Sequence, residues 1–349
     1  MRLLVLSDAS SLHTKRWTEW FSNRGHQVLL ASLEKPNEIT VPFRKLPGDS
    51  GWQSYLAAAR PLRGIIKEFR PHLINAHYVP SYGLLARLVG FRPLAVSAWG
   101  SDLLVSPQKS PLHRLRVKLA LAGADLATCD GDNLKRRIMG FGLSNDRVIN
   151  LPLGVEHSLI LKKAPHVFRG GNIISTRSLE PVYNVDTIIR AISAAVKKTG
   201  RTLSLTIAGD GRLRDSLRDL SQRLGAEGYI RFTGRLRPDQ LIAELDRCGI
   251  YVSASLSDST SVSLLEAMAR GLVPVVSDIP GNREWIEDGI NGYLFPPRDH
   301  GALADIIAKL SGATECKEMV ERNLSLISHR GSWQKNMEVI EGFFLKSIS

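Results

Sequence analysis

Hydrophobic and polar positions alternate along the first 150 residues between short apolar runs and longer segments in which apolar residues recur every three or four positions. The short runs have the length and composition of buried strands, and the longer segments have the period of amphipathic helices. The predicted strands are Leu3–Asp8, Gln27–Ser32, His72–His77, Leu94–Trp99 and Leu126–Gly131. The predicted helices are His13–Gly25, Tyr55–Phe69 with an interruption at Pro61, Pro111–Ala124 and Asp132–Gly140.

The alternation stops near residue 157 and resumes near residue 171. The intervening residues lose the periodicity and gain Lys, Pro and Gly, which is typical of a linker. Further strands are predicted at Asn172–Arg177, Ser204–Gly211, Tyr229–Gly234, Gly249–Ser255 and Gly292–Pro297, with helices that begin at Asn184, Leu213 and Pro238. Two successive βα arrays predict an α/β protein with two Rossmann-like, doubly wound parallel sheets that face a cleft. We expect a first domain over 1–157, a linker over 158–170 and a second domain over 171–328.

The charge of the chain is strongly basic and unevenly distributed. Of a formal net charge of +12, +9 falls in residues 1–160. Such an excess suggests an anionic partner, either a phosphorylated substrate or an anionic membrane surface, although charge that keeps the surface soluble explains any single basic stretch equally well. We expect no nucleic-acid partner, because the basic residues are not interleaved with aromatic ones.

The cysteines and the apolar segments indicate a cytoplasmic protein. The three cysteines, Cys129, Cys248 and Cys316, are far apart and have neither a metal-binding nor a disulfide spacing. The apolar run at the start is too short for a signal peptide, and no stretch approaches the roughly 20 apolar residues needed to span a bilayer. We expect a cytoplasmic chain, with a peripheral position on the inner face of the membrane left open.

Two familiar nucleotide-binding signatures are missing from the chain. No strand leads into GxGxxG, and there is no GxxxxGK[ST] loop, which disfavours a simple dehydrogenase or a P-loop enzyme. Only Asp130–Asp132 has the outline of an acidic DxD metal motif. Its place before a helix makes helix capping the better interpretation, so no metal site is predicted.

The segment Ser257–Val276, SDSTSVSLLEAMARGLVPVV, follows a predicted strand and contains a short helix that ends at Gly271. The helix N-terminus offers free N–H groups to an anion. Near it lie two acids and a series of hydroxyl or first-turn residues, namely Asp258, Glu266, Thr260, Ser261, Val262 and Ser263. Locally, Ser263 and Glu266 also match a capping box, and Asp258 could simply form a turn.

The segment from Ser255 to Pro297 resembles the donor site of the retaining, sugar-nucleotide-dependent glycosyltransferases of the GT-B fold, in the group 1 and family 4-like class. Their signature is an acid, seven residues and a glutamate. Glu266 matches the glutamate, and Asp258 stands where the first glutamate is usual. The region STRSLEPVYN resembles the family's diphosphate-binding segment; Arg177 matches its arginine, whereas Tyr183 replaces a lysine. The IAGDG stretch with Gly209 also fits the family's nucleotide-binding domain.

The first half carries the same resemblance. NAHYVPSYG is similar to the family segment that holds an active-site histidine, here His77, and SAWGSDLL is similar to a segment that places Trp99 and Asp102 on the acceptor side. The family's Gly-Gly loop after the first strand is absent, and Asp8-Ala-Ser-Ser stands in its place. The resemblance also implies that the last residues, 329–349, form a helix that returns to the first domain.

The resemblance implies a retaining glycosyltransferase that moves a sugar from a UDP- or GDP-sugar to a hydroxyl of a glycan or lipid-linked acceptor, in polysaccharide or glycolipid assembly. Arg177, Asp258 and His77 would be catalytic. Glu266, Val262, Ser263, Ser261, Thr260, Gly209 and Tyr183 would bind the donor. No cofactor or metal is implied. A sugar-nucleotide epimerase or phosphorylase on the same scaffold, and a non-catalytic nucleotide-binding relative, remain as alternatives.

The acceptor side is less defined by the sequence. His13 and Arg16, at the start of the first helix, are candidates together with Trp99 and Asp102, although capping and surface placement explain the first two about as well. Ser110–Gly123 is a basic amphipathic segment. Such a helix can lie on an anionic bilayer, or it can be a packed helix whose charges are simply solvated.

Overall fold

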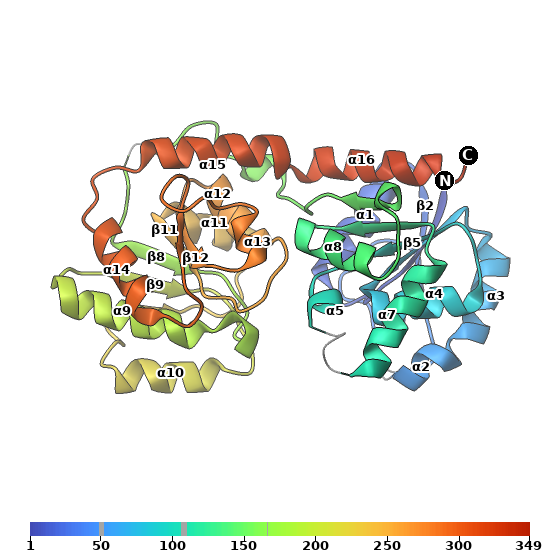
Figure 1. Ribbon diagram of the computed structural model, residues 1–349, viewed down its shortest axis with the longest axis horizontal. Helices are drawn as coiled ribbons and strands as arrows, with labels where there is room; N and C mark the ends of the chain where they lie inside the picture. Colours follow the sequence, from blue (N-terminus) through green and yellow to red (C-terminus); the bar gives the residue numbers. More distant parts are fainter. Residues whose placement is uncertain (49–51, 106–109, 166) are drawn as a thin grey trace. The chain divides into compact units, whose positions relative to one another are not determined.

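The computed structural model describes residues 1–48, 52–105, 110–165 and 167–349 and divides the chain into two compact units. Unit 1 comprises residues 1–152 and 335–349, and unit 2 comprises residues 153–334. Both are α/β units with parallel sheets (Figure 1), so the predicted fold class of two doubly wound parallel-sheet domains is confirmed.

Unit 1 contains a seven-stranded sheet in the order β3-β2-β1-β4-β5-β6-β7. Its strands are β1 (Arg2–Leu6), β2 (Gln27–Ser32), β3 (Phe43–Lys45), β4 (Leu73–His77), β5 (Leu94–Ser97), β6 (Leu126–Cys129) and β7 (Val148–Asn150). Its helices are α1 (Leu12–Asn23), α2 (Trp52–Ala57), α3 (Ala59–Phe69), α4 (Leu84–Val89), α5 (Ser101–Leu104), α7 (Pro111–Gly123) and α8 (Asp132–Gly140). A π-helical turn, η1 (Tyr78–Gly83), joins β4 to α4.

Unit 2 contains a six-stranded sheet in the order β10-β9-β8-β11-β12-β13. Its strands are β8 (Asn172–Ser175), β9 (Ser204–Ile207), β10 (Ile230–Phe232), β11 (Ile250–Ser253), β12 (Val273–Ser277) and β13 (Tyr293–Phe295). Its helices are α9 (Val185–Thr199), α10 (Arg214–Arg223), α11 (Pro238–Asp246), α12 (Val262–Ala269), α13 (Pro280–Arg283), α14 (His300–Leu310) and α15 (Lys317–Arg330).

The order of the strands determines where each sheet can bind a ligand. In both units the chain runs outward from the first strand on one side and then returns to the other side of that strand. The direction therefore reverses between β1 and β4 in unit 1 and between β8 and β11 in unit 2. Ligands of doubly wound sheets bind beyond the carboxyl ends of the strands at this reversal. The segments that follow these four strands are thus the first places to look for a site.

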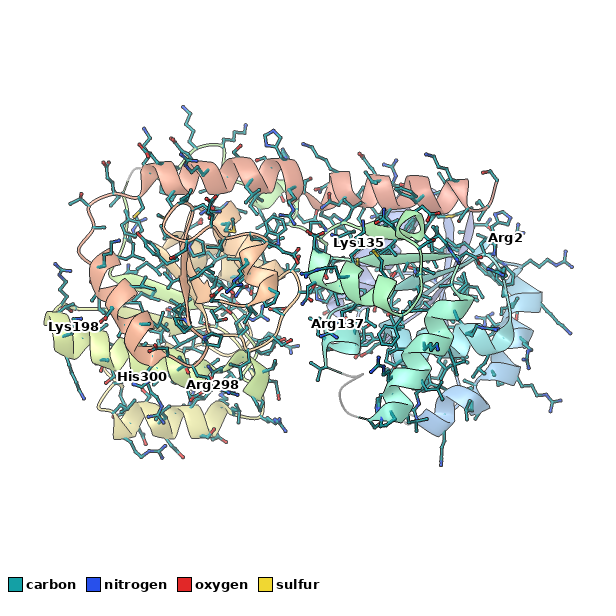
Figure 2. All side chains as sticks on the ribbon, viewed as in Figure 1. Arg2, Lys135, Arg137, Lys198, Arg298 and His300 are labelled. Carbon is teal, nitrogen blue, oxygen red and sulfur yellow. The ribbon has the colours of Figure 1, made fainter. Side chains whose placement is uncertain are left out.

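Apolar side chains fill both faces of each sheet, as the continuous apolar runs predict. In unit 2, one face of the sheet packs against α9 and α14, and these two helices are joined by the Lys198–Asp305 ion pair, with Nζ and Oδ1 2.7 Å apart. Lys198 and His300, labelled in Figure 2, mark this outer helical layer. The other face of the same sheet packs against α12 and its neighbours. The layers leave the strand ends free to carry polar residues.

The boundaries of some elements differ from the predicted ones. The helix expected over Tyr55–Phe69 is two helices that meet at Ala58, and Pro61 lies in the first turn of α3 instead of interrupting a helix. Proline is tolerated there because the first-turn N–H groups have no partner within the helix. The predicted linker 158–170 falls within unit 2, where Ile160 and Phe168 pack against the core.

The C-terminal residues form α16 (Trp333–Lys346). Residues 335–349 are part of unit 1, where the Phe344 ring stacks on Phe21 with the centroids 5.6 Å apart, and Glu341 Oε1 is 2.8 Å from His26 Nε2. The part of the chain that the structure describes contains no helix that is both long and apolar enough to cross a bilayer.

Candidate functional site

Arg177 is the centre of a polar cluster at the reversal point of unit 2. It follows β8, and its guanidinium contacts the loop that follows β11: Nη2 donates to Asp258 Oδ2 at 2.6 Å, and Nη1 donates to Ser261 Oγ at 2.5 Å and to Ser263 Oγ at 2.9 Å. The Cζ atom of the guanidinium lies over the Tyr183 ring, 4.1 Å from the ring centroid. We call Arg177, Tyr183, Asp258, Ser261 and Ser263 the Arg177 cluster.

The environment of Arg177 keeps its side chain charged. Burial lowers its pKa, but the Asp258 carboxylate and the nearby Tyr251 and Tyr183 side chains raise it, and the balance lies above the ordinary value. The residue is 8% exposed. A cation this deeply buried is retained only with compensating contacts, and Asp258 supplies the opposite charge.

Three successive residues at this strand end have buried polar atoms without a partner. Ser175 Oγ, Thr176 Oγ1 and Arg177 Nε make no hydrogen bond to the residues that the structure describes. Buried polar atoms are nearly always paired, so each orphan needs an explanation. Three orphans at the reversal point of a doubly wound sheet indicate the position of a polar ligand.

Two glycines allow the loops of the cluster to pack closely. A Cβ atom on Gly209 would lie 2.1 Å from the carbonyl oxygen of Arg177, and one on Gly281 would lie 2.2 Å from the carbonyl oxygen of Ser259. Gly209 is therefore a backbone spacer beside the predicted site residue. Gly281 was not predicted as a site residue, although its place after Pro280 in a turn was a usable signal.

The first turn of α12 settles which residue caps that helix. Ser261 is the N-cap, and its side chain accepts a hydrogen bond from Leu264 N at 3.4 Å. Ser263 lies inside the helix, where its Oγ is 2.8 Å from the Tyr251 hydroxyl. The capping box between Ser263 and Glu266 is therefore wrong, because Glu266 lies five residues beyond the N-cap instead of three.

The remaining donor-side candidates lie around this same helix end. Val262 begins α12. Thr260 is buried, and its Oγ1 accepts a hydrogen bond from Trp285 Nε1 at 3.2 Å. Glu266 is partly exposed on the second turn. The Tyr251 and Trp285 contacts were not anticipated, since both residues looked like ordinary core aromatics in the sequence.

His77 lies at the reversal point of unit 1, at the end of β4, and is completely buried. Its Nε2 is 3.0 Å from Asn75 Oδ1 and its Nδ1 is 3.0 Å from Ser7 Oγ. Asn75 Nδ2 donates to Ser97 Oγ, so Asn75 Oδ1 accepts from His77 Nε2–H, and Nδ1 accepts from the Ser7 hydroxyl. Burial, with His13 nearby, lowers the pKa of His77 to about 3. This is the environment of a neutral, packed histidine; its catalytic role stays a prediction.

Aromatic rings surround His77. The centroids of Trp17 and Trp99 are 5.1 Å and 4.9 Å from its ring, and His13 lies 5.0 Å from Trp99. The indole Nε1 atoms of Trp17 and Trp99 are buried and have no partner among the described residues. Orphaned donors therefore lie at the reversal points of both units. We call His13, Trp17, His77 and Trp99 the His77 cluster.

The other acceptor-side candidates support this cluster. Asp102 is buried, and its carboxylate accepts Val79 N at 3.1 Å and Trp99 N at 3.0 Å, so it holds the turn after His77. Burial raises its pKa to about 6, against the effect of these backbone donors. Arg16 lies on α1, close enough to His13 to help burial lower the pKa of that histidine to about 4.

These shifts predict that unit 1 loses stability in mild acid. His13 and His77 have pKa values in the folded protein below the ordinary 6.5. Their contribution to the free energy of unfolding is therefore fully present above about pH 6.5 and is lost as the pH falls. Asp102 has the opposite effect, because its pKa in the folded protein is above the ordinary 3.8. Its contribution to the free energy of unfolding is fully present below pH 3.8 and is lost as the pH rises through about 6. Between pH 4 and 6 the two histidines outweigh the one carboxyl group, so unfolding takes up about one net proton, worth about 1.4 kcal/mol per pH unit.

Urea unfolding at pH 7 and pH 5 measures this effect. The free energy of unfolding should be lower at pH 5, and His77→Gln should reduce the difference. His300→Gln, at an exposed position on α14, is the matched control and should leave the difference unchanged. An unchanged pH dependence in His77→Gln would contradict the assignment of a neutral, buried His77.

Unit 2 has a large cavity away from the Arg177 cluster. It has a volume of about 1170 Å³, is lined by residues between His157 and Arg169 and by α15, and includes Gly249 and Gly271 in its wall. These glycines precede β11 and β12, so the cavity lies at the amino ends of the strands. No member of the Arg177 cluster lines it. Among the described residues no group of three or more His, Cys, Asp or Glu side chains could hold a metal ion.

Two family models match the chain, and both describe glycosyltransferases. The model "Glycosyl transferases group 1" matches residues 163–325, and "Glycosyl transferase 4-like" matches residues 2–131. The first range includes the whole Arg177 cluster, and the second includes the whole His77 cluster. The two matched ranges together leave only the segment around residues 132–162 and the C-terminal residues outside.

Curated proteins that are similar to this chain also have names of glycosyltransferases. The putative glycosyltransferase EpsD of Bacillus subtilis is 25% identical in an alignment of 332 positions that covers 86% of this chain and 84% of EpsD. The UDP-N-acetylglucosamine–peptide N-acetylglucosaminyltransferase GtfA subunit of Streptococcus pneumoniae is 28% identical over 204 residues, which are 58% of this chain. The match covers only 38% of that longer relative.

Solved structures share the fold at low sequence identity. HepE of Anabaena, in complex with UDP and glucose, aligns with a TM-score of 0.81 and 18% identity over 98% of this chain and 99% of HepE. Sucrose-phosphate synthase of Thermosynechococcus elongatus aligns with a TM-score of 0.80 and 13% identity over 99% and 98%. With the family matches in both units, the chain belongs to the group 1, family 4-like glycosyltransferases and has their GT-B fold.

Proposed function

We propose that the protein is a retaining glycosyltransferase that uses a nucleoside-diphosphate sugar, with a UDP-sugar as the first choice, and transfers the sugar to a hydroxyl acceptor in polysaccharide or glycolipid assembly. The observation that carries this proposal is the Arg177 cluster, with its orphaned Ser175, Thr176 and Arg177 atoms at the reversal point of unit 2. The UDP in the HepE complex and the UDP-sugar in the GtfA relative's name support the choice of UDP.

The proposed chemistry follows from the charge that develops on the leaving group. As the bond to the sugar breaks, the departing nucleoside diphosphate gains negative charge. The buried guanidinium of Arg177 and the N–H groups that begin α12 are fixed donors that would stabilise it without a metal ion. Glu266 would bind the ribose hydroxyls, and Asp258 would bind the sugar, because carboxylates accept hydrogen bonds from neighbouring hydroxyls.

The acceptor is proposed to bind at the His77 cluster. There the orphaned indole N–H groups of Trp17 and Trp99 can donate to sugar oxygens, and a neutral His77 can do the same only after its present partners Ser7 and Asn75 are exchanged. Front-face attack by the acceptor hydroxyl, with the leaving diphosphate taking its proton, requires no enzymatic nucleophile. It differs in this from the hydrolases that form a covalent intermediate on a second carboxylate.

Asp258→Asn tests whether the Arg177–Asp258 ion pair must open for the donor. In the ligand-free protein Asp258 neutralises the guanidinium, so a diphosphate has to compete with it. Removing that charge should tighten UDP binding, by about threefold to tenfold, while it lowers transfer, since the sugar loses its carboxylate. Calorimetric titration with UDP and a UDP-release assay measure the two effects separately. If both change in the same direction, the dual role of Asp258 is wrong.

Donor identity can be established by thermal shift with the common UDP- and GDP-sugars, because a ligand that binds only the folded state raises its apparent stability. The sugar nucleotide with the largest shift is then incubated with and without acceptors. Release of the nucleoside diphosphate with transfer supports the proposal. A changed sugar nucleotide in the absence of acceptor would instead favour an epimerase, and a dependence on phosphate would favour a phosphorylase.

A non-catalytic nucleotide-binding protein is the second candidate, and one observation favours it. Tyr183 brings an aromatic ring to Arg177 instead of a second cation, and Asp258 balances the charge of Arg177, so the cluster has no net charge. Nucleotide binding without turnover of any donor would support this alternative.

A further inference from the structure

Two carboxylates to which the proposed transfer gives no role follow neighbouring strands of unit 1. Asp8 follows β1, in the segment that replaces the family's Gly-Gly loop, and Glu34 follows β2; both are half-buried. The two strands are parallel, with Leu6 opposite Ala31, so the acids lie at the same edge of the sheet. Because β1 borders the strand reversal of unit 1, this edge is where a ligand of a doubly wound sheet binds.

Each of these carboxylates has one oxygen fixed by the protein and one oxygen without a partner. Asp8 Oδ1 accepts Ser10 N at 2.8 Å and Ser10 Oγ at 2.7 Å. Glu34 Oε2 accepts the Tyr82 hydroxyl and, at 2.9 Å, the Ser32 hydroxyl. Within the described ranges of the chain, Asp8 Oδ2 and Glu34 Oε1 accept no hydrogen bond. Both side chains are therefore oriented, and both keep an oxygen available to a ligand.

No cation compensates the two carboxylates. Among the residues that the structure describes, no Lys or Arg forms an ion pair with Asp8 or Glu34. Lys45, on the adjacent strand β3, donates instead to the backbone carbonyls of Leu33 and Leu46. An anionic ligand would thus meet two uncompensated negative charges at this edge, although residues 1–160 have a formal net charge of +9.

Tyrosine rings border the two carboxylates. The Tyr55 ring meets the Tyr82 ring edge to face, with the centroids 5.4 Å apart. Burial, together with the nearby Glu34 and Asp8 charges, raises the pKa of Tyr55 to about 12, so both acids lie close to this one phenol. Tyr78 is 38% exposed. A sugar can use both kinds of group, because its apolar face packs on aromatic rings and its hydroxyls donate to carboxylates.

A second observation indicates a ligand beside these carboxylates. Ser7 directly precedes Asp8, and its Oγ lies 3.0 Å from His77 Nδ1, so the acids adjoin the His77 cluster. In that cluster the Nε1 atoms of Trp17 and Trp99 are buried and have no partner in the described part of the chain. Buried donors without a partner call for a hydrogen-bonding ligand. The carboxylates therefore continue a site that the orphaned indole N–H groups indicate independently.

We propose that Asp8 and Glu34 bind the sugar acceptor and restrict it to sugars that carry no phosphate or carboxylate group. This inference rests on the proposed sugar transfer and names the acceptor class of that same site. Hydroxyls of the acceptor donate to the two free carboxylate oxygens, whereas an anionic group in the same place is repelled by both charges. The overall basic charge of unit 1 is therefore no guide to a phosphorylated acceptor.

Acceptor-dependent release of the nucleoside diphosphate by the full chain tests the inference. The donor is the sugar nucleotide with the largest thermal shift, and the acceptors are 4-nitrophenyl glycosides of glucose, galactose and the matched glucuronate and galacturonate. At least one neutral glycoside should have a kcat/KM at least tenfold above that of its uronate. Asp8→Asn with Glu34→Gln keeps the shape of both side chains and should reduce this preference at least fivefold. Glu68→Gln with Asp146→Asn removes two exposed acids of unit 1 and should preserve it.

Separate readouts distinguish the ways in which this test can fail. If the wild type neither binds the nucleoside diphosphate in calorimetry nor releases it, the proposed transfer fails and the inference fails with it. If binding and release are present, but the uronates stimulate release as strongly as the neutral glycosides or no glycoside stimulates it, the inference alone is overturned.

The single variant Asp8→Asn keeps the test valid if the double variant is less stable. Glu34 also fixes the Tyr82 hydroxyl, whereas the hydrogen bonds of Asp8 stay within its own loop. The thermal unfolding midpoint of each variant shows which one can be compared with the wild type. A preference for neutral glycosides that is unchanged in a stable variant would overturn the role of the carboxylates.

Discussion

Replacing Arg177 by lysine is expected to lower the rate of nucleoside-diphosphate release from the donor about 100-fold to 1000-fold. A lysine keeps the positive charge, but it has one ammonium group where the guanidinium donates in parallel to Asp258, Ser261 and Ser263. It also lacks the plane that lies over Tyr183. The charge would therefore remain while its position relative to the leaving group would not.

The measurement is the rate of UDP release from a saturating UDP-sugar, with water as acceptor if no better one is known. Arg223→Lys, at an exposed position on α10, is the matched control and should keep the wild-type rate. If Arg177→Lys retains most of the activity, Arg177 contributes only its charge, and the geometric part of the account is wrong.

Gly209→Ala is the second change with a large expected effect. The new Cβ would meet the backbone carbonyl of Arg177 at 2.1 Å, and backbone cannot rotate away as a side chain can. The loop that carries Arg177 would have to move, which should weaken UDP binding at least tenfold and cost about 1–3 kcal/mol of stability. The substitution would therefore act on the site by moving the backbone that carries Arg177.

Gly228→Ala provides the control in the same unit, because a Cβ there would have no neighbour within 4 Å. Calorimetric titration with UDP and urea unfolding of both variants give the two readouts. We expect Gly209→Ala to bind UDP more weakly than Gly228→Ala does. Equal UDP affinity in the two variants would show that the position of the Arg177 backbone does not matter.

Much of the fold was predictable because buried parallel strands are continuous apolar runs. The strands near Leu3, Gln27 and Leu126 were found in this way, and so were those of unit 2 near Asn172 and Ile250. The short edge strand β3 was missed, since three partly exposed residues leave no apolar run. The turn η1 was missed as well, because its residues show neither a helical nor a strand period.

The residues of the candidate site could be selected from the sequence, but the contacts between them could not be predicted. Arg177 and Asp258 were selected separately, as the ends of two segments 81 positions apart, and nothing local in the sequence pairs them. The strand order brings them together, since β8 and β11 are neighbours in the sheet. Tyr183 was identified as the replacement of a lysine, but its stacking on the guanidinium depends on the backbone between them.

A short local motif led to a wrong interpretation of the start of helix α12. Ser263 and Glu266 fit a capping box, yet the helix begins two residues earlier, at the cap formed by Ser261. The residue that decides the cap, Ser261, lies just outside the four-residue capping-box motif. His77 has the flanking sequence of an active-site histidine, and its ring contacts Asn75 on its own strand β4 and Ser7 at the end of β1.

Calorimetric titration of UDP and GDP against the wild type and Arg177→Lys tests whether the Arg177 cluster binds the diphosphate of the donor. We expect the wild type to bind at least one of the two nucleotides, Arg177→Lys to bind it at least tenfold more weakly, and Arg223→Lys to bind it like the wild type. Equal affinity of the wild type and Arg177→Lys, or no binding of either nucleotide by the wild type, would contradict it.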